Sequence, residues 1–169
     1  MPRQSSERTF VIDSIEFARQ WQRLSGTIAL RDFERLADQL VGVEGSVSFF
    51  VAGEAQEGGD KFLSLSIEAN LPLRCQRCLG TIDLPLHLKS RLLLVESGKE
   101  WPDEGLDDDS ADAIAADRAL NLAPLIEDEL MLALPLAPRH DECKAPDFAG
   151  KNGRALPFAG LAELKKIRV

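Results

Sequence analysis

The chain of 169 residues contains no tyrosine, and aromatic residues make up only 6% of it. We therefore do not expect a surface that reads RNA sequence by stacking several bases on aromatic rings. No apolar run approaches the roughly 20 residues that a helix needs to cross a bilayer. The residues from Met1 to Arg8 also lack the apolar centre of a secretory signal. These absences predict a cytoplasmic protein with no membrane partner.

Cysteine is equally scarce, because the chain has only three. An odd number in a chain without a secretory signal does not suggest a disulfide framework. The three cysteines are nevertheless not scattered. Cys75 and Cys78 form a Cys-x-x-Cys pair, and Cys143 follows His140 with the same spacing. This pattern points to metal or thiol chemistry.

The net charge of −8 has a local origin. Between Glu96 and Asp117 the chain carries nine acidic residues and one lysine, which accounts for the whole imbalance. Residues 98–112 show little hydrophobic periodicity, so we expect an acidic loop there. The end of the chain is basic from Lys144 onward. An acidic total argues against broad nonspecific binding to nucleic acid, but it leaves room for a local basic face.

The middle of the chain alternates apolar and polar residues. Val43 to Ala52 and Phe62 to Leu71 predict an antiparallel hairpin, with a loop over residues 53–61. The alternation returns at Ile82 and runs to Val95, so the cysteine pair should lie in the turn between two strands. A zinc knuckle has this setting, whereas thioredoxin-type pairs open a helix.

Helices are expected on either side of these strands. Asp13 with Glu16 predicts a capping box, followed by apolar residues at helical spacing as far as Leu24. Asp32 is a candidate cap for a second helix. Asn121 predicts the start of a third helix, which should be a core helix ending at Pro135.

The predicted fold class is α+β, with an antiparallel β-sheet, flanking helices, an acidic loop and a short C-terminal helix. That last helix should cover residues 157–166, after a Gly- and Lys-rich linker over residues 144–156. We expect residues 1–169 to form a single domain.

Cys75, Cys78, His140 and Cys143 together form a candidate Cys3His set. Thiolates and imidazole suit Zn²⁺, and four protein ligands would leave no open position, so the site would be structural. Two alternatives remain open at this point. The cysteines could be ordinary metal-free residues, or Cys75 and Cys78 could form a redox dithiol.

No catalytic site is predicted. Glu127, Asp128 and Glu129 are consecutive on the expected helix, so they should point in different directions and should not share one site. No nucleophile or phosphate-binding loop accompanies them. We therefore predict that the chain is not an enzyme and has no small-molecule substrate. His87 alternates with leucines on an expected strand, so it should face solvent or have its polar atoms satisfied by hydrogen bonds.

Several of these motifs occur in an order that resembles the YceD family, the bacterial large ribosomal RNA subunit accumulation proteins. The resemblance rests on Cys75 to Leu79, Leu125 to Pro135, the pair His140 and Cys143, and Pro157 to Lys165. One difference is Leu156, where an asparagine is expected before the Pro-Phe pair. The resemblance implies a non-catalytic role in 23S ribosomal RNA synthesis, processing or stability during large-subunit assembly.

Contact residues for ribosomal RNA or a pre-ribosomal particle would be cationic. The candidates are basic residues near the cysteine pair, on the following strand and in the C-terminal segment: Arg74, Arg77, Lys89, Arg91, Lys165 and Lys166. A solvated basic face with no ligand is the alternative. The acidic loop could attract a basic ribosomal protein. A module that binds a protein partner and affects RNA only indirectly would carry the same residues.

Overall fold

The computed structural model describes residues 10–57, 59–99, 101 and 111–146. Its main element is a mixed sheet of five strands in the order β2-β3-β4-β5-β6. The elements of this sheet are β2 (Arg23–Ala29), β3 (Ser46–Ala55), β4 (Lys61–Arg74), β5 (Thr81–Val95) and β6 (Asp112–Ala115). A separate two-stranded sheet pairs β1 (Val11–Ile12) with β7 (Leu120–Asn121). The predicted α+β class, dominated by its sheet, is confirmed.

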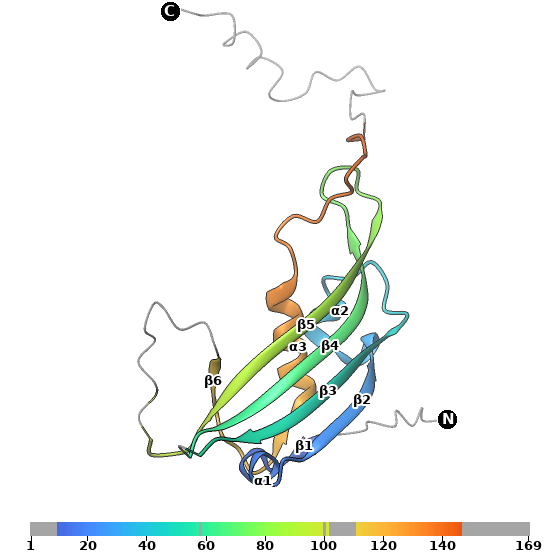
Figure 1. Cartoon of the computed structure of the whole chain (residues 1–169). Helices are drawn as coiled ribbons and strands as arrows, with labels where there is room; N and C mark the ends of the chain where they lie inside the picture. Colours follow the sequence, from blue (N-terminus) through green and yellow to red (C-terminus); the bar gives the residue numbers. More distant parts are fainter. Residues whose placement is uncertain (1–9, 58, 100, 102–110, 147–169) are drawn as a thin grey trace, which may run out of the picture.

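The first four strands of the main sheet are antiparallel, as their alternation predicts. β6 is the exception, because it pairs with the end of β5 in parallel. β4 and β5 are much longer than their neighbours, and their ends project beyond the rest of the sheet as a two-stranded ribbon (Figure 1). The turn at the tip of this ribbon contains Cys75 and Cys78.

Four helical segments accompany the sheet: α1 (Ser14–Arg19), the 3-10 turn η1 (Leu30–Asp32), α2 (Glu34–Ala37) and α3 (Leu122–Ala133). Asp13 caps α1 by accepting a hydrogen bond from the backbone of Glu16 at 3.0 Å, as predicted. Asn121 caps α3 in the same way. In the described part of the chain, no helix combines the length and apolar character needed to cross a bilayer.

Two helix predictions are wrong. The helical pattern that runs to Leu24 is interrupted, because α1 ends at Arg19 and Trp21 adopts a left-handed backbone with a φ of 53°. Leu24 instead belongs to β2. Asp32 does not cap α2, since it lies within η1 and Phe33 occupies the cap position without a side-chain hydrogen bond.

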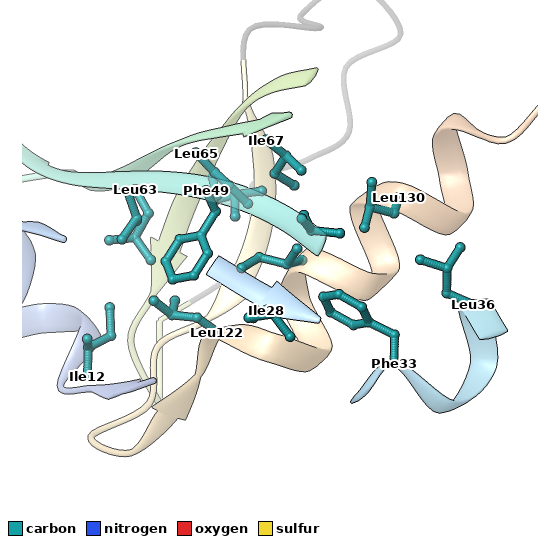
Figure 2. Packing of buried hydrophobic residues seen from close by; sticks show 14 of the residues in the cluster. Ile12, Ile28, Phe33, Leu36, Phe49, Leu63, Leu65, Ile67, Leu122 and Leu130 are labelled. Carbon is teal, nitrogen blue, oxygen red and sulfur yellow. The ribbon is translucent and has the colours of Figure 1, made fainter. Parts of the chain in front are cut away.

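The core lies between one face of the sheet and the helices. Alternate residues of β4, such as Leu63, Leu65 and Ile67, point to this face and are buried. Leu122 and Leu130 of α3 pack against them (Figure 2). α1 crosses β3 at Gly53, where a Cβ atom would lie only 2.4 Å from the carbonyl oxygen of Phe17. The residues that alternate with these core residues along each strand point to the opposite face of the sheet.

The acidic loop expected over residues 98–112 and the linker over residues 144–156 lie mostly outside the described residues. The predicted C-terminal helix over residues 157–166 lies entirely outside them.

Candidate metal centre

The first cysteine pair is positioned by the turn that joins β4 to β5. The last paired residues of the ribbon are Arg74 and Thr81. Beyond them the backbone N–H of Cys75 donates to the carbonyl of Gly80 at 2.8 Å, and the N–H of Leu79 donates to the carbonyl of Cys75 at 2.9 Å. Leu79 closes the turn with a φ of 63°. The prediction that the pair lies between two strands is therefore confirmed.

The second ligand pair comes from the segment that follows α3. The helix ends at Ala133, and Pro135 cannot continue it. The chain then runs to the tip of the ribbon, where the N–H of Gln76 donates to the carbonyl of Pro138 at 2.8 Å. This backbone contact holds the segment against the turn, so that His140 and Cys143 reach the first cysteine pair.

The structure brings all four predicted ligands together, since their donor atoms lie within 4.8 Å of one another. The Cys75 and Cys143 sulfurs are 3.8 Å apart, and the Cys78 sulfur lies 3.4 Å from Nδ1 of His140. A tetrahedral Zn²⁺ site with Zn–S of about 2.3 Å and Zn–N of about 2.0 Å has S–S edges of about 3.8 Å and S–N edges of about 3.5 Å. The donor set therefore fits zinc in its chemistry, and these two distances match the edges of a tetrahedral site.

The ring of His140 is oriented by its second nitrogen. Nε2 lies 3.0 Å from the carbonyl oxygen of Thr81, the first residue of β5. Because a carbonyl can only accept, this hydrogen bond places the ring proton on Nε2 and leaves the lone pair of Nδ1 facing the sulfurs. Metal-binding histidines commonly use such a second hydrogen bond to fix their tautomer.

Electrostatics distinguish the cysteines. Burial would raise the pKa of the Cys75 thiol, but hydrogen bonds from the backbone of Cys78, His140 and Arg77 lower it to about 5. The pKa of Cys143 is instead raised, first by burial and then by its neighbours Cys75 and Cys78. Cys75 is thus a thiolate at neutral pH, whereas a second thiolate beside it is disfavoured. A divalent cation would relieve that repulsion.

All three cysteines are free thiols in the structure. Cys75 is fully buried, and the other three ligands are half-buried. Four protein ligands complete a tetrahedron, so the arrangement suits a structural site rather than a catalytic one. The low pKa of Cys75 would also suit a redox dithiol, but the pair lies in a hairpin turn and not at a helix N-terminus.

The candidate contact residues do not form a single patch. Arg77 lies at the tip, where its guanidinium donates to the carbonyl of Cys143 at 3.4 Å, and Arg74 is exposed beside it. Lys89 and Arg91 are on β5, eight or more residues from the ribbon end at Thr81. At about 3.4 Å per residue this separation exceeds roughly 27 Å. Lys165 and Lys166 lie outside the described residues.

The three consecutive acidic residues of α3 have two different partners. Glu127 and Asp128 share the guanidinium of Arg35, at 2.9 and 2.6 Å, although they are consecutive on the helix. Glu129 points away and accepts a hydrogen bond from Ser90. The three therefore do not share one site, as predicted, although Glu127 and Asp128 contact the same guanidinium. Sequence gave no signal for this contact, because its partners are more than 90 residues apart.

Glu127 also supplies the cap that Asp32 does not. One of its carboxylate oxygens accepts from the backbone N–H groups of Arg35 and Leu36, at 2.8 and 3.0 Å. These are orphan donors in the first turn of α2. The side chain of Glu127 is buried, and it joins α2 to α3.

His87 is 76% exposed in its side chain, with Glu68 as its neighbour at 3.8 Å, so the prediction that it faces solvent is confirmed.

Comparison with known proteins gives one match. The family model described as large ribosomal RNA subunit accumulation protein YceD matches residues 63–165, which is more than half of the chain. The matched region begins in β4 and includes all four ligands of the candidate metal centre. No curated protein and no solved structure matches the chain.

Proposed function

The chain belongs to the YceD family, and from this membership we propose that it is a cytoplasmic ribosome-biogenesis factor. It supports the synthesis, processing or stability of 23S ribosomal RNA in large-subunit assembly, and it does so without catalysis. The match over residues 63–165 is the observation that carries this proposal. We propose in addition that residues 1–169 form one YceD-like domain.

Within this role, Cys75, Cys78, His140 and Cys143 hold a structural Zn²⁺. The proposal is supported by the two ligand distances that match tetrahedral edges, and by the hydrogen bond between His140 and Thr81. Zinc would fasten the ribbon tip to the segment after α3. It would thereby hold Arg74 and Arg77 at a fixed place beside the site.

Arg74 and Arg77 are the proposed contacts to ribosomal RNA at this tip. Guanidinium groups bind phosphates well, and Arg74 is exposed whereas Arg77 is half-buried. A rigid turn limits the entropy lost on binding. We propose that Lys165 and Lys166 add contacts from the C-terminal segment. Lys89 and Arg91 form a separate site on β5. A basic ribosomal protein, attracted by the acidic residues between Glu96 and Asp117, is a further partner.

A protein-binding module is the second candidate, and a specific surface favours it. A groove of about 350 Å³ lies beside the ribbon, between the end of α3 and the end of β4. Its lining includes Leu73, Met131, Leu134 and Leu136. Leu136 is fully exposed, which leaves apolar surface free for a partner. In this case the effect on ribosomal RNA would be indirect.

Metal content tests the zinc assignment. Protein purified without chelator is expected to contain one zinc per chain by elemental analysis, because four ligands converge. The variants Cys143→Ser and His140→Ala each remove one ligand and should lose most of the metal. His87→Ala is the matched control, since this exposed histidine lies outside the cluster. Substoichiometric metal in the wild-type protein would refute the assignment.

The cellular role is tested by the ratio of 23S to 16S ribosomal RNA. Deleting the gene is expected to lower this ratio, and the intact gene should restore it. An unchanged ratio in the deletion strain would refute the proposed function. Complementation with the double variant Arg74→Glu, Arg77→Glu then separates the two candidates. Failure to restore the ratio, together with loss of RNA crosslinks, indicates direct contact, whereas failure of a Leu136→Asp variant alone indicates a protein partner.

A further inference from the structure

The face of the main sheet opposite the core is open in the described part of the chain. Its residues alternate with the core residues along β2 to β5 and are mostly exposed. Hydroxyl side chains dominate the middle of this face. They come from β2, β3 and β4: Ser25, Thr27, Ser46, Ser48, Ser64 and Ser66. Such a face has many hydrogen-bonding groups and little bulk.

One large apolar side chain interrupts this polar surface. Phe50 of β3 is 42% exposed, although its neighbour Phe49 is buried in the core. The cross-strand partners of Phe50 are Ser25 and Ser66, both of which are small. Side chains directly opposite each other are the ones that could cover the ring. Neither serine is large enough, so one surface of the aromatic ring remains available.

Cations lie in the same rows of the sheet as this ring. The row through Phe50 continues from Ser66 to Lys89 on β5. Two strand spacings separate Phe50 from Lys89, or roughly 10 Å between their backbones. The adjacent row passes from Ser64 to Arg91. A shallow cavity of about 370 Å³ lies here, lined by both serines, both cations and Asp112 among others.

The guanidinium of Arg91 is held in place before any ligand arrives. It stacks on the ring of Phe62 at 3.9 Å from the centroid and lies 3.6 Å from Glu54. Glu54 also accepts a hydrogen bond from Ser64 at 2.5 Å. Fixing a long side chain in this way lowers the entropy lost when it binds an anion.

We propose that this open face binds a segment of single-stranded RNA, with one base stacked on Phe50 and backbone phosphates at Lys89 and Arg91. The hydroxyls of Ser25 and Ser66 are within reach of the stacked nucleotide. The inference rests on the proposed function and gives its RNA a second contact site, distant from the ribbon tip. Single strands are favoured because only an unpaired base exposes its surface to an aromatic ring.

The charged side chains on this face determine where the RNA backbone crosses it. Glu68 lies in the row on the other side of Phe50, next to His87. Glu54 and Asp112 also lie on the side of Lys89 and Arg91, where two cations balance them, whereas Glu68 has only the exposed His87 beside it. A phosphate near Glu68 would be repelled, so the RNA backbone passes on the side of Lys89 and Arg91.

A protein partner would instead require a contiguous apolar patch. Here the exposed ring is that of Phe50, which stands among hydroxyls and cations, because Phe62 on the same face is buried under Arg91. One ring supports binding that tolerates many sequences, in keeping with the low aromatic content.

The inference is tested by the fluorescence anisotropy of a labelled, mixed-sequence 15-nucleotide single-stranded RNA. Losing one stacked base costs roughly 5- to 150-fold in affinity, so Phe50→Ala should weaken binding by that factor. Phe50→Leu keeps an apolar side chain without a ring and should weaken binding similarly. Phe50→Trp should bind at least as tightly as the wild type, and RNA should quench its added fluorescence. Trp21→Ala is the control, since it removes an exposed aromatic residue that follows α1.

Salt dependence tests the phosphate contacts separately. Each phosphate contact to a single strand adds about 0.7 to the slope of log affinity against log salt. Lys89→Gln should lower this slope by about that amount, and Glu68→Gln should leave it unchanged or raise affinity slightly.

The inference is overturned if Phe50→Leu binds like the wild type, if the matching RNA duplex binds as tightly as the single strand, or if the wild-type protein does not bind the RNA. These outcomes leave the proposed function standing, because its own test is the ratio of 23S to 16S ribosomal RNA in the deletion strain. If the ratio of 23S to 16S ribosomal RNA is unchanged in the deletion strain while RNA binding depends on Phe50, the open face binds RNA and the proposed function is refuted.

Discussion

Replacing Glu127 with alanine is expected to destabilise the fold, because this buried side chain joins α2 to α3. Its carboxylate is the acceptor for the backbone N–H groups of Arg35 and Leu36, at 2.8 and 3.0 Å. Leu36 is fully buried, so water cannot easily replace the lost acceptor there. The same carboxylate also receives the guanidinium of Arg35 at 2.9 Å.

The magnitude follows from these contacts. Hydrogen bonds to a charged group contribute about 1.5–3 kcal/mol each, and the Glu127 carboxylate accepts two of them from the backbone N–H groups of Arg35 and Leu36. We therefore expect Glu127→Ala to lower the free energy of unfolding by about 3–5 kcal/mol. Glu127→Gln keeps one acceptor oxygen, so its loss should be about 1–2 kcal/mol. Arg35→Ala leaves both backbone bonds intact and should cost less than Glu127→Gln.

Urea unfolding followed by far-ultraviolet circular dichroism measures these differences, with zinc kept in excess. Asp128→Ala is the matched control, because Asp128 binds the same guanidinium from an exposed position and its loss should cost about 0–1 kcal/mol. If Arg35→Ala destabilises the protein as much as Glu127→Ala, the ion pair dominates and capping of α2 is not the main contribution. Equal effects of Glu127→Ala and Asp128→Ala would refute the role of burial.

Three further predictions concern packing, protonation and capping. Gly53→Ala should lower the free energy of unfolding by about 1–3 kcal/mol, because the added Cβ would lie 2.4 Å from the backbone oxygen of Phe17. Urea unfolding measures this free energy, and an unchanged value would mean that α1 shifts freely to make room for the methyl group. Zinc affinity should rise with pH through neutrality, because the raised pKa of Cys143 means that the metal must displace a proton from this thiol, whereas Cys75, with a pKa of about 5, is already ionised. Competition with a chromophoric chelator measures the affinity at each pH, and an affinity that does not change with pH would contradict this prediction. Asn121→Ala should cost about 1 kcal/mol through loss of the α3 cap, and Asn121→Asp, which keeps an acceptor, should cost clearly less in the same unfolding assay.

Much of the fold could be predicted because local patterns and tertiary structure agree. The alternation in β3, β4 and β5 places one set of side chains in the core, and a shift of one residue would expose all of them. Asp13 and Asn121 cap the helices that they were expected to cap, since the bonds they make are local. The cysteine pair falls in a turn because both flanking strands were evident.

The errors arise where distant contacts override local preference. Trp21 fits a helical pattern, yet the chain turns there because β2 must begin at Arg23 to pair with β3. The parallel strand β6 is short and follows the acidic segment, so its pairing with β5 left no periodic signal. The cap of α2 comes from Glu127, on a helix that follows much later in the sequence.

The ligands of the candidate metal centre could be predicted from the sequence, but the hydrogen bond that orients His140 could not. Ligand types and equal spacing identify Cys75, Cys78, His140 and Cys143 before any coordinates. The carbonyl of Thr81, which orients His140, is a backbone group and has no sequence signature. The open face was missed for a related reason. The alternation puts Phe49 on the core face with Val47 and leaves Phe50 on the opposite face, but only the tertiary structure shows that this opposite face is exposed.

Cys143 follows Cys75 by 68 positions, so the two ligands are synthesised at different times during translation. At roughly 5–20 residues per second, Cys143 leaves the ribosome about 3–14 s after Cys75. A chain that stalls or is cut within that interval carries only the first cysteine pair and cannot surround an ion. Metal occupancy would therefore distinguish chains synthesised past Cys143 from shorter fragments.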